Sequence, residues 1–148
     1  MTWFDEELKH ICDIIQGTAL ICSPSAQEHL DQIAAKYPPS PVQPIDWSKV
    51  SRSISYDISI AHDAAAFFAA VRTICAQLQI KELILVPDSF ADCSLRIQPE
   101  FVAQTVQHVR KLPGGQFLGP TDWRWVADLR WAGAAFLSIP SSVSLTSM

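Results

Sequence analysis

The stretch SISYDISI, residues 53–60, decides the fold class of this chain. Isoleucine and tyrosine alternate strictly with serine and aspartate, so an extended backbone would have one apolar and one polar side. A helical pattern follows over residues 63–78, where large apolar side chains recur every three or four positions among alanines. Together the two patterns predict a half-buried strand followed by a helix that packs against the sheet.

The sequence before this strand predicts two more helices with a short strand between them. Residues 3–16 have apolar side chains at helical spacing, and Thr2 stands where a capping residue is expected. Residues 18–22 form a short apolar segment that is typical of a strand. Ser25 and Glu28 have the spacing of a capping box, which marks the start of a second helix that ends before a run of prolines.

The C-terminal half predicts further strands and one more helix. Apolar runs at residues 82–86 and 94–97 are typical of strands, with a loop over residues 87–93. Pro99 suits the first position of a fourth helix. Beyond that helix, alternation over residues 116–139 predicts a pair of antiparallel strands.

This order of elements is not a regular β-α-β alternation. It predicts an α+β fold, a single domain over residues 1–139 with a mixed or mainly antiparallel sheet and about four helices packed against one of its faces. The serine-rich residues 140–148 are expected to form a loose C-terminal tail.

The composition limits the classes of function. The chain has 148 residues, a formal net charge of −4, 49% hydrophobic residues and only 18% charged residues. These values exclude a disordered chain, a coiled coil, a basic protein that coats nucleic acid and a multi-domain enzyme. The negative charge disfavours nucleic acid as a partner, and the low charge density predicts that a protein partner or a homo-oligomer contact covers apolar surface.

No membrane or targeting segment is expected. The longest apolar run, residues 64–71, is far shorter than the ~20 residues that a membrane span needs. The N-terminal residues are acidic, whereas a signal peptide begins with basic residues. The sequence therefore predicts a cytoplasmic protein with no membrane partner.

Four cysteines, at positions 12, 22, 75 and 93, are predicted to be reduced. No two of them form a C-x-x-C motif, and Cys12 and Cys75 fall on apolar helix faces. Cys93 falls in a predicted loop and is therefore expected to be the most reactive.

The sequence contains no motif for binding phosphate or a dinucleotide and none of a known hydrolase. No two of its four histidines are three or four residues apart, so no metal and no other cofactor is expected. Two enzymatic alternatives are Cys93 as a nucleophile, although the sequence ties no histidine to it, and Asp88 with Asp92 as paired carboxylates.

Three tryptophans, Trp123, Trp125 and Trp131, fall on one face of a predicted long strand. Such a face is either part of the core or a binding surface, because tryptophan is common at binding hot spots. The sequence leaves both interpretations open. Arg124 and Arg130 fall on the opposite face, which disfavours a stacking site for single-stranded nucleic acid.

The loop PDSFAD is the predicted binding site for a basic protein partner. Asp88 and Asp92 flank Phe90, which would be the apolar anchor of the interface. Asp57 and Asp122 would add further negative charge nearby. Carboxylates at the rim of an interface mainly accelerate association and make binding sensitive to salt.

Residues 81–139 resemble the small immunity proteins encoded beside bacterial contact-dependent and other polymorphic toxins. The similar pattern is a strand, an acidic loop and a second strand in LILVPDSFADCSLRI, a helix in PEFVAQTVQHVRKL, and a tryptophan-rich hairpin in DWRWVADLRWAGAAF. The resemblance implies a non-enzymatic cytoplasmic protein that binds one cognate toxin domain and blocks it. The alternatives are an adaptor or regulatory subunit with the same binding surface, and the small Cys- or Asp-dependent enzyme described above.

Overall fold

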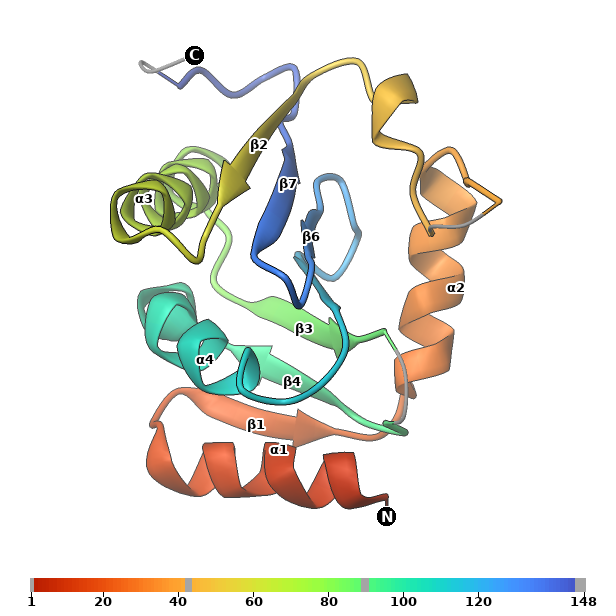
Figure 1. The fold of residues 1–148 in the computed structure, drawn as a ribbon, viewed down its shortest axis with the longest axis vertical. Helices are drawn as coiled ribbons and strands as arrows, with labels where there is room; N and C mark the ends of the chain where they lie inside the picture. Colours follow the sequence, from red (N-terminus) through yellow and green to blue (C-terminus); the bar gives the residue numbers. More distant parts are fainter. Residues whose placement is uncertain (1, 42–43, 89–90, 146–148) are drawn as a thin grey trace.

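The computed structural model describes residues 2–41, 44–88 and 91–145, and it confirms an α+β fold (Figure 1). The described residues form four α-helices and seven strands. The strands make one sheet, which has helices on both of its faces. The elements, in chain order, are α1 (Trp3–Ile14), β1 (Thr18–Ile21), α2 (Ala26–Lys36), η1 (Trp47–Lys49), β2 (Ser53–Asp57), α3 (Ala61–Leu78), β3 (Leu83–Pro87), β4 (Ser94–Ile97), η2 (Pro99–Phe101), α4 (Val102–Val109), β5 (Gln116–Gly119), β6 (Ala127–Leu129) and β7 (Ala134–Ser138).

The sheet has the strand order β1-β4-β3-β5-β6-β7-β2, and every neighbouring pair is antiparallel. Strand β2, with the sequence SISYD, lies at one edge of the sheet and is only half buried, as its alternation predicted. It ends at Asp57, and the last residue of its predicted alternation, Ile60, is instead exposed at the start of α3. None of the helices in the described part of the chain is long and apolar enough to cross a membrane.

The first two helices begin as their capping patterns predicted. The Thr2 hydroxyl accepts a hydrogen bond from the Asp5 backbone N–H at 3.1 Å, and the Ser25 hydroxyl accepts one from the Glu28 N–H at 3.2 Å. In both capping boxes the acidic side chain accepts a hydrogen bond from the backbone N–H of the capping residue. Local sequence therefore fixes where α1 and α2 start.

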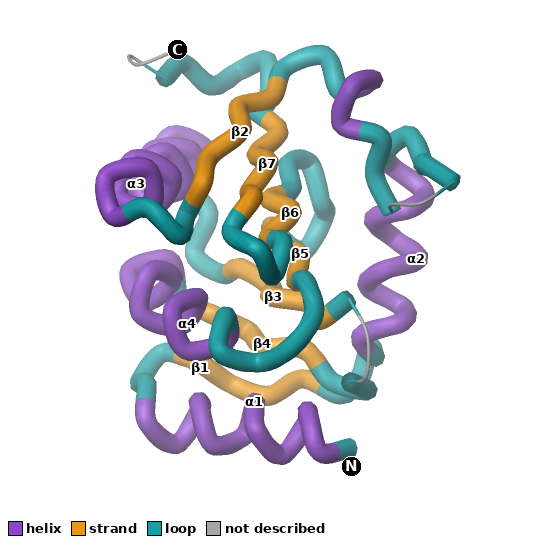
Figure 2. Tube along the Cα trace, in the orientation of Figure 1, coloured by secondary structure: helices purple, strands orange, loops and turns teal. Residues whose placement is uncertain are grey.

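Helices cover both faces of the sheet, so the expectation that they pack on one face is wrong. Helices α1, α3 and α4 contribute to one apolar cluster, and α2 and η1 contribute to a second. Figure 2 shows α2 on the other side of the sheet from α3 and α4. Strand β3 shows why, because Leu85 belongs to the first cluster and its neighbours Ile84 and Val86 to the second. All five residues of β3 are buried, which is typical of a strand covered on both sides.

The predicted long tryptophan strand does not form. A loop over residues 120–126 interrupts it, because Trp123 adopts a positive φ of 54°. Trp123 and Trp125 are both buried, but they belong to different apolar clusters on opposite faces of the sheet. Trp131 is 65% exposed in the turn between β6 and β7. The first two tryptophans are core residues, and only the third is available to a partner.

Residues 140–145 are packed against the domain, so the expectation of a loose tail is wrong for them. Val143 and Leu145 are buried in the same cluster as α3. The Gln77 side chain donates to the Ser144 carbonyl at 2.8 Å and accepts from the Ser144 N–H at 3.1 Å. The domain therefore extends beyond residue 139, and the remaining tail residues, 146–148, lie outside the described part of the chain.

Cys22 and Cys93 form a disulfide, so the prediction that all four cysteines are reduced is wrong for this pair. The last register pair of β1 and β4 is Ile21 opposite Ser94, which places the two cysteines next to each other as the strands continue. Their Cα atoms are 4.2 Å apart. Cys12 and Cys75 are free, as predicted.

Candidate functional site

Three of the five candidate binding residues lie at the same end of the sheet. Asp57 is the last residue of β2, Asp88 follows β3, and Asp92 lies two residues before β4. Because neighbouring strands are antiparallel, the ends of β2 and β3 and the start of β4 lie at the same end of the sheet. At about 4.8 Å per strand, they span about 24 Å from β4 to β2. The structure thus places three exposed carboxylates at the same end of the strands, spread across the twisted sheet.

The other two candidates are not brought to this surface. Asp122 lies in the β5–β6 loop at the opposite end of the strands, where it forms a 3.0 Å ion pair with Arg124. Its backbone carbonyl accepts a hydrogen bond from the Lys36 ammonium. Phe90, the proposed anchor, lies outside the described residues.

Large exposed apolar side chains gather at the same end as the three carboxylates. Trp131 is 65% exposed and Ile60 is 54% exposed, and their two turns are joined because the Ile58 N–H donates to the Gly133 carbonyl at 2.8 Å. Trp3, 60% exposed, lies two residues before Asp5 in α1. The N-terminus of α1 therefore reaches this surface, since the Asp5 carboxylate accepts the Asp92 N–H at 3.0 Å.

We call this surface the acidic end and define it by six residues: Trp3, Asp57, Ile60, Asp88, Asp92 and Trp131. The α4–β5 connection also reaches it and contributes an exposed cation, Lys111. Neighbouring Arg110 is turned inward and donates to the Ile58 carbonyl at 3.0 Å.

Asp57 is held in place by its own turn. Its Oδ1 accepts the Ser59 N–H at 3.0 Å and the Ser59 hydroxyl, and these bonds lower the pKa of Asp57. Its backbone N–H donates to Asp63 Oδ2 at 2.9 Å. Asp63 does not cap α3, because the capping position is Ile60, which makes no side-chain hydrogen bond. Asp63 instead fixes the end of β2.

Asp92 is held through its backbone by two other elements. Its N–H donates to Asp5, as above, and its carbonyl accepts the Ala26 N–H at 2.9 Å. The same Asp5 oxygen also accepts the Cys93 N–H at 2.9 Å. Burial pushes the pKa of Asp5 upward, but hydrogen bonds from Thr2, Cys93 and Asp92 outweigh it and leave the pKa lowered. The α1 helix, the α2 helix and the disulfide thus meet at the base of this loop.

Asp88 is exposed beside a buried ion pair that the sequence analysis did not single out. Asp128 is buried and accepts two bonds from Arg130, at 2.8 and 2.7 Å, and one from the Trp47 indole N–H at 2.9 Å. Desolvation by neighbouring groups raises the pKa of Asp88, the Asp128 charge raises it further, and Arg130 opposes both. In the sequence, the one indication of this ion pair was Asp128, a charged residue in the middle of a predicted strand.

The structure offers no free thiol to the enzymatic alternative at Cys93, whereas the carboxylates of the other alternative, Asp88 and Asp92, are both exposed. Cys93 is bonded to Cys22 and buried, so no thiolate is available at this position. His29 Nδ1 lies 3.1 Å from the Ser94 hydroxyl, but both side chains are buried, and burial lowers the pKa of His29. This pair is a hydrogen bond of the core. Among residues 2–41, 44–88 and 91–145, no group of three or more His, Cys, Asp or Glu side chains could hold a metal ion.

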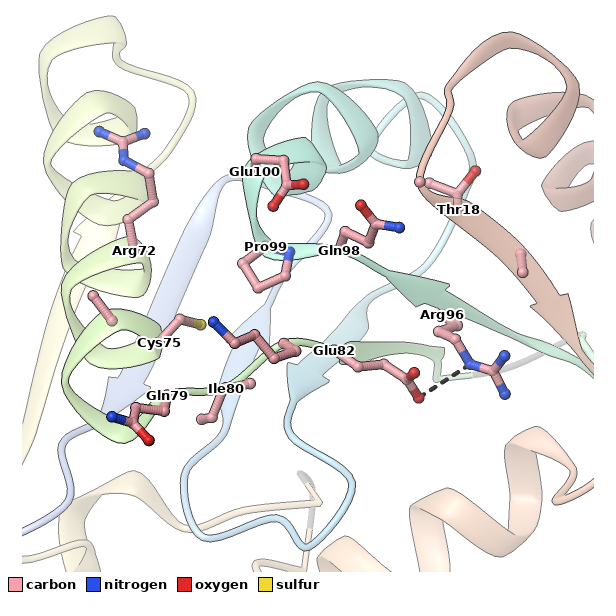
Figure 3. A pocket seen from close by; sticks show the side chains of 14 residues that line it. Thr18, Arg72, Cys75, Gln79, Ile80, Glu82, Arg96, Gln98, Pro99 and Glu100 are labelled. Carbon is pink, nitrogen blue, oxygen red and sulfur yellow. Dashed lines mark ion pairs between the residues drawn. The ribbon is translucent and has the colours of Figure 1, made fainter.

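A groove of about 1100 Å³ lies at the other end of the sheet (Figure 3). It is bordered by α3, by the beginnings of β1 and β3, and by residues 96–100 after β4. Three cations line it, Arg72, Lys81 and Arg96. The two ends of the sheet therefore present different surfaces.

No protein-family model matches the sequence, and no curated protein matches it. The function is therefore inferred from the acidic end and from the resemblance of residues 81–139 to immunity proteins.

Proposed function

We propose that this chain is a non-enzymatic, cytoplasmic immunity protein that binds a cognate bacterial toxin domain through its acidic end. The observation that carries the proposal is the position of exposed Trp131 and Ile60 on two joined turns beside Asp57, at the same end of the strands as Asp88 and Asp92. Exposed aromatic side chains surrounded by polar groups are typical of interface hot spots.

The charges of the acidic end favour a basic partner. Asp57 and Asp92 are fixed by hydrogen bonds from neighbouring elements, so a partner meets an ordered pattern of negative charge. Such carboxylates accelerate the approach of a cationic protein and repel acidic ones. Toxin domains that cleave nucleic acid are cationic where they bind their substrate, and an acidic inhibitor complements that surface.

The resemblance to immunity proteins supports the class of function, although it assigns no residue of the binding surface. Residues 81–139 include Asp88, Asp92 and Trp131, which are half of the acidic end. The span of about 24 Å from β4 to β2 suits an interface of ordinary size, which buries about 800 Å² on each partner. An adaptor subunit would use the same surface, and the loss of toxin activity in the complex distinguishes an immunity protein from it.

The cytoplasmic part of the proposal requires that the Cys22–Cys93 pair, which is bonded in the structure, be reduced in the source cells. Disulfides persist in oxidising compartments and are rare in the cytosol. Thiol trapping in the source cells measures the state of the pair directly. A reduced pair supports a cytoplasmic location, and an oxidised pair places the protein in an oxidising compartment.

The binding test compares two exposed apolar residues at opposite ends of the molecule. Trp131→Ala should weaken binding of the toxin domain encoded beside this chain by about 2 kcal/mol or more in isothermal titration. Ile14→Ala is the matched control, because Ile14 is 63% exposed on the last turn of α1, away from the acidic end. Equal affinity of the Trp131→Ala variant and the wild type contradicts the proposed surface.

A growth assay completes this test. Wild type and Ile14→Ala should protect cells that express the toxin domain, whereas Trp131→Ala should protect them less. Tight binding without any loss of toxin activity would indicate an adaptor instead.

A further inference from the structure

Helix α1 presents two large apolar side chains to solvent. Trp3 is 60% exposed and Ile14 is 63% exposed, and among the described residues the other large exposed hydrophobic side chains are Ile60 and Trp131. Figure 1 shows α1 along the border of the molecule, beside β1. A partner can therefore approach this helix from outside.

The two exposed side chains are the ends of a regular stripe along the helix. The α1 stripe consists of Trp3, Glu7, His10 and Ile14. Successive members are four, three and four residues apart, which is the spacing of a coiled-coil seam. At about 100° and about 1.5 Å per residue, all four lie within about 30° of one line that is about 17 Å long. His10 is exposed and Glu7 is partly exposed, so the stripe is open along its length.

Packing inside the domain orders the stripe before any partner binds. The Thr2 hydroxyl caps the start of α1 through the Asp5 N–H, and Phe4 and Leu8 are buried in the core beneath the helix. The Trp3 ring packs edge-on against the Phe4 ring, with their centroids 6.3 Å apart. A partner of α1 thus meets an ordered helix rather than a mobile one.

The order of side chains in the α1 stripe is complementary to its own reverse. If two copies of α1 pack antiparallel about a two-fold axis at the middle of the stripe, Trp3 faces Ile14 of the second copy. In the same arrangement Glu7 faces His10 of the second copy. The imidazole N–H of His10 can then donate to the Glu7 carboxylate. Neither side chain has a hydrogen bond or an ion pair with any described residue that this pairing would break.

The inner pair also specifies the orientation of the helices. In a parallel arrangement the two Glu7 carboxylates would face each other, and so would the two His10 rings. Polar residues at the inner positions of a seam select the arrangement that pairs them with a complementary group. The α1 stripe therefore fits a second copy of this chain in the antiparallel direction.

We propose that this chain forms a two-fold symmetric dimer in which the α1 stripes of two copies pack antiparallel. Each copy contributes the same residues, so the contact closes at two copies. Helix α1 has 12 residues, and one such helix pair buries less than the about 1,600 Å² of a standard interface, so the dimer forms only at high concentration. The inference is independent of the proposed immunity function, because Ile60 and Trp131 do not belong to the stripe.

Sedimentation velocity of the full chain measures the dimer without any toxin domain. The exposed Glu6 and Asp13 flank the stripe, so the experiment uses about 0.15 M salt to screen repulsion between the copies. The average mass should rise from that of the monomer toward that of the dimer between roughly 10 µM and 1 mM, a range that suits a contact below the standard size. A constant monomer mass up to about 1 mM overturns the proposal.

Two isoleucine variants identify the surface that pairs. Ile14→Glu should raise the Kd of the dimer at least about tenfold, because a carboxylate would then face Trp3 of the second copy. Ile60→Glu is the matched control, since Ile60 is 54% exposed outside α1 and the change in charge is the same. Both side chains are exposed, so the variants should fold, and urea unfolding verifies it. A Kd unchanged by Ile14→Glu, or raised equally by Ile60→Glu, overturns the assignment to α1.

A charge swap tests the antiparallel orientation. Glu7→Lys should raise the Kd at least about threefold, because His10 of the second copy loses its acceptor and meets a cation. Glu7→Lys combined with His10→Glu should restore the Kd to within about twofold of the wild-type value, because each carboxylate again faces a complementary group. In a parallel dimer the same swap would leave like charges opposed. A double variant that dimerises no better than Glu7→Lys alone contradicts the antiparallel arrangement.

Discussion

The two ends of the sheet differ in chemistry although the same strands build both. At the acidic end, Asp57 and Asp92 are fixed by hydrogen bonds and stand beside exposed tryptophans. At the other end, Arg72 and Lys81 line a groove with both signs of charge. The net charge of −4 is therefore unevenly distributed, with exposed carboxylates at one end of the strands and a groove lined by both signs of charge at the other.

The largest expected effect tests whether both ends depend on one core. Phe67 is fully buried on α3, in the cluster that also contains Leu85 and Trp125. Phe67→Ala should lower the free energy of unfolding by about 3–5 kcal/mol, because it removes a buried ring and leaves a cavity. Urea unfolding at equilibrium measures it. A loss below about 1 kcal/mol would show that the α3 face is placed wrongly.

The next largest effect on stability is expected from the disulfide at the acidic end. The disulfide links residues 71 positions apart, and its loss in Cys22→Ser combined with Cys93→Ser should cost about 2–4 kcal/mol of stability. Reductant should destabilise the wild type but not this variant, and the Cys12→Ala control should keep the sensitivity to reductant. Four free thiols in the unfolded, unreduced protein would contradict the pairing.

A smaller and pH-dependent effect comes from Asp5. Its pKa is lowered in the folded state, so its contribution to stability is complete above its unfolded pKa of about 3.9. That contribution is lost as the pH falls through the folded value. Asp5→Asn should therefore cost about 2 kcal/mol at pH 7, and the difference from wild type should shrink below about pH 4.

The control for this pH dependence is another acid of the same helix. Asp13 is exposed, and Asp13→Asn should leave the shape of the stability curve unchanged. Urea midpoints measured between about pH 2 and pH 7 compare the three proteins. A difference between wild type and Asp5→Asn that stays constant over this range would show that Asp5 makes no charged hydrogen bonds.

The smallest effect is expected at the opposite end from Asp5. Arg124 and Asp122 form an ion pair whose side chains are 47% and 52% exposed. Arg124→Gln should change the free energy of unfolding by less than about 0.5 kcal/mol, because solvent screens such pairs. Urea unfolding of Arg124→Gln beside wild type measures the change. A loss above about 1 kcal/mol would show that this pair is more than a surface contact.

Local patterns in the sequence predicted the parts of the fold that depend on local physics. The Thr2 and Ser25 capping boxes, the apolar face of α3 and strand β4 are where the sequence placed them. The tryptophan strand failed because the positive φ at Trp123 breaks the alternation. A Cβ at Gly119 would lie 2.7 Å from the Trp123 ring, so this glycine allows the loop to close against the sheet.

The candidate site was predictable in part. The acids at 57, 88 and 92 stand next to strand ends, and their sequence context indicated this. Their shared position depends on strand order, which brings β2 and β4 into one sheet and which no local pattern specifies. The same long-range pairing creates the Cys22–Cys93 bond and moves Asp122 away from the other carboxylates.

Hydrogen exchange of the complex with the cognate toxin domain tests the central claim most directly, because it reports which end of the sheet the partner covers. The account predicts slower exchange of backbone amides at residues 57–60 and 130–133 in the complex, and unchanged exchange at residues 79–82 and 96–100. Protection of the groove segments, with residues 57–60 and 130–133 unaffected, would contradict it.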